Sequence, residues 1–598
     1  MQVGARLQTN GQCDFSVWAP FAEKVEVHIV SPTDRTIQLS KDDQGYWKGS
    51  AQVDGNSRYL YRINGDERPD PASNFQPEDV HKASQVIDQS KFEWTDKSWS
   101  GTPQENLIIY EIHVGTFTSD GNFDAAIGRL NDLKELGITA IEIMPVAQFP
   151  GNRNWGYDGV YPYAVQNSYG GPDALKRFVN ACHEKGLSVV LDVVYNHLGP
   201  EGNYLSVFGP YFTEKYKTPW GSAINYDDAY CDGVRNFFIE NALYWFRDYH
   251  IDALRLDAVH AIYDNSAKHF LLELSERVEN LSKELGRNLY LIAESDADDV
   301  RTIRSKEQGG LGMNAQWCDD FHHCVHTLLT KETSGYYEDY GRFDQMVKAL
   351  REGFVYSWEY SPHRKKRYGS SSVDEDGKKF VVFLQNHDQI GNRMLGERLS
   401  NLVSFEELKL AVGTMLLSPY IPLLFMGEEY GETAPFLYFV SHSDADLIRG
   451  VREGRKNEFK SFAWQGEPPD PQSEDTFNRS KLHWERRNDG NHRILLDLYR
   501  QLIALRKSVP ALRSTNKKNS EVTSFDDESL ILLKRWQADS SVICIFNYSE
   551  TERDISNKLG QGSWKRVIDS SDTTWGGDGS ANDHLHIRPF SFAVLQGE

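Results

Sequence analysis

Cysteine is scarce and scattered in this chain of 598 residues. No two of its six cysteines form a Cys-x-x-Cys pair, because they stand at Cys13, Cys182, Cys231, Cys318, Cys324 and Cys544. This spacing argues against a disulfide framework and favours reduced thiols, as in the cytoplasm. The first residues also lack the apolar core of a signal peptide. We therefore expect a cytoplasmic protein.

Basic residues and long hydrophobic runs are also in short supply. The chain has 65 Lys and Arg against 87 Asp and Glu, a net charge of −22 at pH 7. Proteins that bind phosphate-rich surfaces usually show the opposite balance, so we expect neither nucleic acid nor membrane as a partner. The most apolar stretch, 411–427, contains two prolines, and a membrane-spanning helix needs about 20 apolar residues. This stretch instead predicts a buried helix followed by a buried strand.

Aromatic residues, in contrast, are plentiful, with 14 Trp, 29 Tyr and 30 Phe. Such side chains stack on flat ligands such as sugar rings, and they also fill large cores, so the count alone favours a sugar-binding protein only slightly. The chain is longer than the roughly 250–300 residues at which a single core stops growing. We expect one large domain with smaller domains beside it.

The first 97 residues have the pattern of a small antiparallel β-sandwich. Apolar and polar residues alternate in 24–30 and again in 59–63, between stretches rich in Gly, Asn, Asp and Pro. A period of two, punctuated by turn residues, is typical of strands buried on one face. We expect an immunoglobulin-like domain over residues 1–97. The polar stretch 95–103 is predicted to be a linker.

The pattern changes over residues 105–512, where apolar strand candidates alternate with amphipathic helices such as 123–137 and 264–286. Nearly continuous apolar strands between helices are typical of a parallel sheet covered on both faces. We count eight candidates, near residues 109, 141, 190, 254, 291, 318, 383 and 424. Eight such units predict an α/β fold of the (β/α)8 TIM barrel type. Short strands return over residues 513–598 and predict a second β-sandwich.

Polar residues stand where four of these strands end. They include Asp192, Arg255 with Asp257, Glu294, and Asp388. Each acid taken alone could be a helix N-cap, which is common after barrel strands. Arg255 and Asp257, however, alternate inward on one strand, and buried charges need partners. Because barrel active sites lie at the carboxyl ends of the strands, the set predicts a site at that rim.

Such a set of residues suits the cleavage of a glycosidic bond. The reaction uses one ionised and one protonated carboxyl group. Arg255 is placed to lower the pKa of Asp257, and the apolar end of its strand is expected to raise the pKa of Glu294. Asp388 adds a third charge near the sugar hydroxyls. The residues therefore predict a glycoside hydrolase.

Four segments resemble, in order and spacing, the signature segments of the α-amylase family of glycoside hydrolases: DVVYNH (192–197), RLDAVH (255–260), AES (293–295) and NHD (386–388). The resemblance implies a retaining enzyme with Asp257 as nucleophile, Glu294 as proton donor and Asp388 as transition-state stabiliser. It further implies a sugar subsite at the cleaved bond, formed by Tyr157, Asp192, His197, Arg255 and His387.

A narrower resemblance extends over nearly the whole chain. The stretches 316–323, 384–393 and 425–435 are similar to those of trehalose-releasing members, and WAP (18–20) resembles the carbohydrate-binding-module-like leading domain of branching and debranching relatives. It implies hydrolysis of the α-1,4 bond next to the terminal trehalose unit of malto-oligosyltrehalose, without a cofactor. It implies contacts with this oligosaccharide from Leu256, Ala258, Val259, His260, Asp319, Asp320, Phe321, His322, His323, Gln389, Ile390, Gly391 and Asn392.

Several alternatives stay open. A branching or debranching enzyme of the same family acts on α-1,6 bonds. A non-catalytic relative is expected to lack a carboxylate, yet all three are present. The segment 318–324 also contains Cys, Asp and His residues, but adjacent His322 and His323 point in different directions, so we expect no metal. Glu111 and His113 are expected to be structural.

Overall fold

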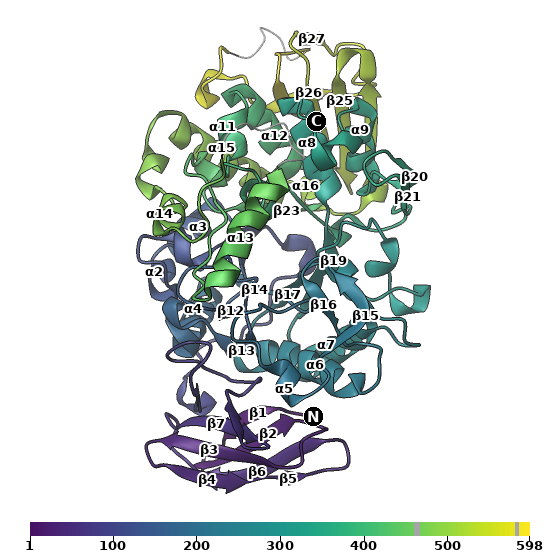
Figure 1. The fold of residues 1–598 in the computed structure, drawn as a ribbon. Coiled ribbons are helices and arrows are strands. Elements are labelled where there is room, and N and C mark those ends of the chain that lie inside the picture. The colour runs from purple at the N-terminus through teal and green to yellow at the C-terminus, as the bar shows by residue number, and fades with distance from the viewer. Residues whose placement is uncertain (460–466, 580–584, 598) are drawn as a thin grey trace.

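The computed structural model describes residues 1–459, 467–579 and 585–597. Figure 1 shows three parts stacked along the molecule: antiparallel strands near the N-terminus at the bottom, a parallel barrel in the middle, and antiparallel strands near the C-terminus at the top. This is the predicted architecture, a (β/α)8 TIM barrel between two β domains. The domain boundaries near residues 97, 105 and 512 stay predictions.

Two antiparallel sheets form the N-terminal part. One pairs its strands in the order β1-β2-β6-β5, and the other in the order β4-β3-β7-β8, with β9 on β7. Phe15 of the first sheet meets Tyr59 of the second edge to face, with ring centroids 5.2 Å apart. The predicted sandwich is confirmed, with strands β1 to β9 at Gly4–Leu7, Gln12–Trp18, Val25–Ser31, Arg35–Gln38, Ser40–Lys41, Tyr46–Gln52, Arg58–Ile63, Asp66–Arg68 and Ser84–Gln85.

The stretch 95–103, predicted to be a linker, is fastened to the base of the barrel. His183 lies between two carboxylates, with Nδ1 2.7 Å from Asp96 and Nε2 3.0 Å from Asp252. Trp99 donates its indole N–H to Asp252 at 2.7 Å. Burial opposes protonation of His183, but the two carboxylates outweigh it and raise its pKa. The stretch, called the strap below, is therefore bound to the barrel by hydrogen bonds.

The eight predicted barrel strands are confirmed and close into one parallel barrel. Alternate residues of a barrel strand point inward. The lower inward layer is apolar, with Val190 and Ala253 in one buried cluster. Two residues further along the same strands, Asp192 and Arg255 are charged and buried. The strands are β10 Ile109–Ile112, β11 Ala140–Ile143, β14 Ser188–Val193, β17 Ala253–Leu256, β18 Tyr290–Ala293, β19 Ala315–Trp317, β22 Phe380–Phe383 and β23 Ile421–Phe425.

Helices surround the barrel, and two of them differ from the prediction. The helix expected over 264–286 begins only at Phe270, because Asp264 accepts the backbone N–H of Phe270 at 2.5 Å and pairs with Arg235 at 2.7 Å. The helix expected over 123–137 is split into two. The two halves of the split helix are α2 Phe123–Ile127 and α3 Leu130–Leu136. The longer helices are α4 Gly171–Glu184, α6 Cys231–Asp248, α7 Phe270–Leu285, α8 Asp319–Thr330, α9 Phe343–Glu352, α12 Phe405–Leu417, α13 Ala445–Glu458 and α15 Gly490–Ser508.

The C-terminal part is one five-stranded antiparallel sheet in the order β24-β25-β26-β30-β28. Beside it lies a two-stranded pair, β27 with β29. Ile555, directly after β27, and Ile587 on β29 belong to the apolar cluster on one face of the larger sheet. The second layer of this β domain is therefore small. The strands are β24 Ser520–Phe525, β25 Leu530–Gln537, β26 Ser540–Asn547, β27 Arg553–Asp554, β28 Trp564–Asp569, β29 His586–Ile587 and β30 Ser591–Gly597.

Arg535 on β25 ties this sheet to the barrel. Its buried guanidinium donates to the carbonyls of Leu417 (2.7 Å) and Ser418 (3.0 Å) at the end of α12, and to that of Ser514. Carbonyls at a helix end lack partners within the helix. Arg535→Met removes this donor, and of the three carbonyls that of Ser418 keeps a second donor, Arg506, at 2.7 Å. Because buried carbonyls lose their partner, we expect the free energy of unfolding to fall by roughly 2–4 kcal/mol.

Urea unfolding followed by circular dichroism measures this loss. The matched control is exposed Arg513, whose replacement by Met is expected to change stability by less than about 0.5 kcal/mol. Equal, small effects of the two substitutions would contradict the role given to Arg535.

The described part of the chain contains no helix that is both long and apolar enough to cross a membrane. All six cysteines are free thiols, as their scattered positions predict, and five of them are buried. Burial raises the pKa of the Cys13 and Cys544 thiols to about 12, which keeps them protonated and unreactive.

Candidate active site

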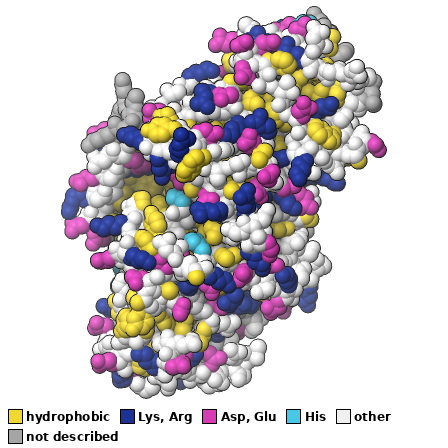
Figure 2. Space-filling model, turned by 90° about the vertical axis from the view of Figure 1, so that its right-hand side faces the viewer, with side chains coloured by type: hydrophobic (Ala, Val, Ile, Leu, Met, Phe, Trp, Pro, Cys, Tyr) yellow, Lys and Arg dark blue, Asp and Glu magenta, His cyan; other side chains and the backbone are white. Residues whose placement is uncertain are grey.

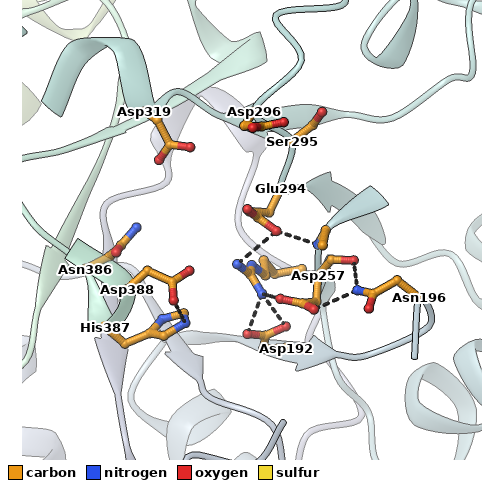
Figure 3. Close-up of polar contacts among 12 residues, drawn as sticks. Asp192, Asn196, Asp257, Glu294, Ser295, Asp296, Asp319, Asn386, His387 and Asp388 are labelled. Carbon is orange, nitrogen blue, oxygen red and sulfur yellow. Dashed lines mark hydrogen bonds and ion pairs between the residues drawn. The ribbon is translucent and has the colours of Figure 1, made fainter. Parts of the chain in front are cut away.

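Arg255 lies at the centre of the charged layer. It stands on β17, its guanidinium lies 4.2 Å from the ring centroid of Trp317, and its side chain is fully buried. Its Nη1 donates to both oxygens of Asp192, at 3.0 and 2.8 Å, and to Asp257 at 2.9 Å. Its Nη2 lies 3.5 Å from Glu294. One buried cation thus gathers three carboxyl groups from three strands (Figure 3).

Asp257 directly follows β17 and is held as an ionised carboxylate. Asn196 donates to the side chain and to the backbone carbonyl of Asp257, each at 2.7 Å. Burial by itself would raise the pKa of Asp257, but the attraction of Arg255, together with the hydrogen bond from Asn196, outweighs burial and lowers it. The side chain is only 10% exposed. Asp257 therefore presents a negative charge at a narrow opening.

Glu294 follows β18 and has the opposite tendency. It accepts the backbone N–H of Ala258, and its side chain is 14% exposed. Burial, together with the negative charges of Asp257 and Asp388, outweighs the attraction of Arg255 and raises the pKa of Glu294 well above its usual range. The environment of Glu294 therefore favours the protonated acid.

The shared guanidinium keeps these two carboxyl groups close together. Asp257 lies on Nη1 of Arg255 and Glu294 on Nη2, and these nitrogens belong to one rigid planar group. The pair therefore lies within the roughly 9.5 Å that is the upper limit for hydrolysis by two carboxyl groups. An ionised carboxylate beside a protonated one is the arrangement that glycosidic cleavage requires.

A fourth strand end, that of β22, supplies Asp388. It lies on the short helix α10, His387–Gly391, which Asn386 caps. The side chain of Asp388 is 38% exposed, and its Oδ1 lies 3.5 Å from Nε2 of His387. Figure 3 shows Asp388 and Glu294 on opposite sides of one open space. The predicted convergence of distant segments is therefore present in the geometry.

Tyr157 connects Asp192, at the end of β14, with His387, after β22. Its hydroxyl donates to Asp192 at 2.6 Å, and the same oxygen lies 2.7 Å from Nε2 of His387. The rings of Tyr157 and His387 stack, with centroids 5.2 Å apart. Burial and the negative charge of Asp257 raise the pKa of Asp192 to about 6, against the attraction of Arg255. These residues thus form one hydrogen-bonded layer, called the floor of the site below, and its use as a sugar subsite stays a prediction.

His197 lies at the edge of this floor. Its Nε2 is 3.1 Å from the carbonyl of Tyr157, and its ring stacks on the exposed ring of Trp220, with centroids 4.8 Å apart. Burial lowers the pKa of His197. The ring is therefore held neutral and in a fixed orientation.

Asp319 begins helix α8, Asp319–Thr330, and faces the opening (Figure 3). It accepts a hydrogen bond from Gln389 at 3.3 Å. Burial, followed by the negative charges of Asp296 and Asp388, raises the pKa of Asp319 to about 7. Asp319 therefore exchanges its proton near neutral pH and can act as donor or acceptor toward a hydroxyl.

The next three side chains of α8 point into the interior. Asp320 accepts the hydroxyl of Tyr340, Phe321 is fully buried, and Nε2 of His322 lies 3.0 Å from the hydroxyl of Tyr337. In this structure they support the helix that carries Asp319. Their predicted contact with sugar does not follow from their position.

Other members of the predicted contact set are packing around the site. These residues are at most 5% exposed: Leu256, Ala258, Val259 and Ile390. Gly391 leaves no room for a side chain, since a Cβ there would lie 2.0 Å from the ring of Trp155. These buried side chains support the residues that surround the site.

Three further predicted contacts are at least partly exposed. His260 is exposed at the rim. His323 is half-buried, with its ring 4.7 Å from that of Tyr340. Asn392 donates to Asp388 at 3.4 Å. The structure therefore retains His260, His323 and Asn392 as candidate contacts.

Two polar residues belong to the site although neither was predicted there, since Glu111 was expected to be structural and Asn196 was given no role. Asn196 holds Asp257, and it lies inside the segment 192–197, whose pattern was sufficient to find it. Glu111 on β10 accepts the backbone N–H of His387 at 3.1 Å and lies 2.5 Å from its Nδ1. No local pattern marks Glu111, because its partner is 276 residues away.

The remaining sequence candidates lie elsewhere. Within the described ranges, no group of three or more His, Cys, Asp or Glu side chains could hold a metal ion. Glu428 and Glu429 accept hydrogen bonds from Tyr499 (2.8 Å) and Tyr110 (2.9 Å) inside the core. Their carboxyl groups are therefore used in packing at the end of β23.

The surface shown in Figure 2 carries mixed charge. Lys and Arg side chains are interspersed with Asp and Glu, and histidines lie near the middle of the face. This face therefore lacks the continuous basic patch that polyanion-binding proteins present.

Comparison with known proteins agrees with this geometry. Residues 87–218 match the model of the alpha amylase catalytic domain, and residues 2–79 match that of carbohydrate-binding module 48, the isoamylase N-terminal domain. The fold is similar to the crystal structure of a putative alpha amylase from Salmonella typhimurium, with a TM-score of 0.90, 37% identity and full coverage of both chains.

Relatives at higher identity share one name. The chain is 51% identical to malto-oligosyltrehalose trehalohydrolase from Saccharolobus solfataricus, over 85% of this chain and 87% of that protein. It is 43% identical to the protein of the same name from Rhizobium sp., over 89% and 90%. A 1,4-alpha-glucan branching enzyme from Bacillus caldolyticus is only 30% identical, over 70% and 64%. The chain therefore belongs to the malto-oligosyltrehalose trehalohydrolases, glycoside hydrolases with an α-amylase-type catalytic domain.

Proposed function

We propose that this enzyme hydrolyses the α-1,4 bond next to the terminal trehalose unit of malto-oligosyltrehalose and releases trehalose. The observation that carries the proposal is that two carboxyl groups beside the same guanidinium, that of Arg255, have pKa values shifted in opposite directions. The pKa of Asp257 is lowered, while that of Glu294 is raised well above its usual range. Bond cleavage with retention needs this division between nucleophile and acid.

In the first step, Asp257 attacks the anomeric carbon, and Glu294 gives its proton to the oxygen of the departing trehalose. A covalent glycosyl-enzyme ester forms while the glycosidic bond breaks. In the second step, Glu294 takes a proton from water, and the resulting hydroxide attacks the same carbon. The ester bond breaks, Asp257 is released as a carboxylate, and the sugar keeps its α configuration.

Other side chains of the floor support these steps. Asp388 is placed to stabilise the positive charge that develops on the sugar ring, since it is a partly exposed carboxylate facing the same space as Glu294. The stacked ring of Tyr157 is placed to support the sugar ring. Arg255, buried between its carboxyl partners, keeps Asp257 ionised and oriented.

The preference for a trehalose end over a branch point rests on the names of the relatives. Proteins named trehalohydrolase match at up to 51% identity, against 30% for the branching enzyme. Scattered free thiols are consistent with a cytoplasmic enzyme. We place the reaction in trehalose biosynthesis, because its product is trehalose.

Product analysis tests this function directly. Incubation with malto-oligosyltrehalose is expected to yield trehalose and a shortened malto-oligosaccharide, while branched glycogen is left intact. Proton NMR during the first minutes is expected to show the α-anomer at the new reducing end, as retention requires. Glucan branching activity without trehalose would favour the alternative enzyme. A β-anomer formed first would contradict the assignment of Asp257 as nucleophile.

A further inference from the structure

Glu111 is a buried carboxyl group that the proposed mechanism does not yet use. It stands on β10, is 1% exposed, and lies beside Glu142 in the register of the neighbouring strand β11. Its Oε2 accepts the backbone N–H of His387 at 3.1 Å, and its Oε1 lies 2.5 Å from Nδ1 of the same residue. Both oxygens therefore contact one residue of the active site.

The hydrogen-bond partners define the protons on His387. The hydroxyl of Tyr157 carries a single proton, which it donates to Asp192. The oxygen of Tyr157 can then only accept from Nε2 of His387, 2.7 Å away. On the other side of the ring, the carboxylate of Glu111 is an acceptor for Nδ1. Both ring nitrogens therefore carry hydrogen, so His387 is an imidazolium.

We propose that Glu111 is a positioning residue of the reaction, which acts through His387. By accepting from Nδ1 and from the backbone, it keeps His387 doubly protonated and fixed in orientation. His387 can then donate a hydrogen bond to the oxygen of Tyr157, so that the tyrosine hydroxyl donates its own proton to Asp192. The positively charged ring of His387 also lies beside Asp388. This inference deepens the proposed function and rests on it.

The charges around His387 agree with this arrangement. Burial by itself lowers the pKa of His387, but Asp388 and Glu111 outweigh burial and raise it to about 9. The titratable and charged groups that face His387 come from several elements: Glu111 on β10, His113 after it, Glu142 on β11, Tyr157, Asp192 on β14, Arg255 on β17 and Asp388 on α10. Of the carboxyl groups, only Glu111 is hydrogen-bonded to its ring.

Glu111→Gln tests the proposal through the pH profile of kcat/KM for trehalose release. Without this carboxylate, Asp388 still opposes burial but the attraction and the hydrogen bond of Glu111 are lost. The pKa of His387 therefore falls, and the imidazolium is lost at lower pH. We expect the alkaline limb to move toward lower pH by about one unit or more, and activity at neutral pH to fall by about 10- to 100-fold. A uniform loss at every pH would indicate a merely structural role and overturn the proposal.

Glu142→Gln is the matched control. Glu142 is equally buried, and neither of its carboxyl oxygens has a hydrogen-bond partner among the described residues. Burial and the negative charge of Glu111 raise the pKa of Glu142 well above its usual range, so this group is already neutral. Its replacement should leave the alkaline limb in place. A shift equal to that of Glu111→Gln would overturn the special role of Glu111.

Two further measurements keep the test decisive. If Glu111→Gln does not fold, Glu111→Asp replaces it. Because this shorter side chain weakens the contact, its alkaline limb should shift less but in the same direction, and an unmoved limb rejects the proposal. In the His387→Gln background, the further substitution Glu111→Gln should lower kcat/KM by less than about threefold. If it lowers kcat/KM as much as it does in the wild-type background, Glu111 does not act through His387. A wild-type enzyme that releases no trehalose would instead refute the proposed function.

Discussion

Replacement of Glu294 by glutamine is expected to slow trehalose release by about 10²- to 10⁴-fold while the fold and substrate affinity persist. Glutamine has the shape of the acid and can still accept the N–H of Ala258. It has no acidic proton, so the departing trehalose oxygen leaves as an unprotonated alkoxide. The measurement is kcat and KM for malto-oligosyltrehalose, with circular dichroism as the check on folding.

A substrate whose leaving group needs no proton makes this test specific. Fluoride departs from a malto-oligosyl fluoride without strong acid assistance, so Glu294→Gln should release fluoride in its first turnover within about tenfold of the wild-type rate. Later turnovers should stay slow, because hydrolysis of the glycosyl-enzyme ester still needs Glu294 as the base. Asp296→Asn is the control, because Asp296 lies on the same loop with 45% of its side chain exposed. This substitution should lower the rate of trehalose release only slightly. Trehalose release near the wild-type rate would refute Glu294 as the acid.

Much of the fold was predictable because its signals are local. Strands buried on both faces need continuous apolar sequence, and this pattern located all eight strands of the barrel. The strap at 95–103 was missed because its order depends on tertiary contacts, such as Trp99 with Asp252. The start of α7 was misplaced for the same reason, since the pair between Asp264 and Arg235 ends the loop only when the chain is folded.

The site was predicted in part, and the helical period explains most of the remainder. The strand rule brought the carboxyl groups to one rim, because inward positions on neighbouring strands meet there. In the segment 319–323, however, the chain is already helical. Side chains four residues apart share a face, so Asp319 and His323 lie near the opening while the three between them turn inward. A sequence motif does not reveal this rotation.

Glu111 illustrates a different limit. On a barrel strand, a buried glutamate has the same local sequence whether it is structural or serves the site. Its role depends on a contact with His387 that spans 276 residues. Glu142, its neighbour in register, has no such contact among the described residues. Physical position, and not residue type, distinguishes these two acids.

Asp257→Asn is expected to reduce trehalose release by about 10⁴-fold or more, because the amide cannot form the glycosyl-enzyme ester. The fold should survive, since the oxygen of the new amide can still accept from Asn196, and Arg255 keeps Asp192 as its partner. Loss of the negative charge of Asp257 also removes one cause of the raised pKa of Glu294. Asp257→Asn therefore removes the nucleophile and also changes the pKa of the acid catalyst, whereas Glu294→Gln removes the acid catalyst alone.

The fluoride substrate separates the two roles. A good leaving group compensates for a missing acid but not for a missing nucleophile. Asp257→Asn should therefore release no fluoride from malto-oligosyl fluoride, while Glu294→Gln recovers the first turnover. Asp257→Ala, which cannot revert by deamidation, should behave in the same way. If either Asp257 variant cleaved the fluoride within about tenfold of the wild-type rate, the carboxylate would not be the nucleophile. The ionised carboxylate of Asp257 would then serve only to balance the charge of Arg255.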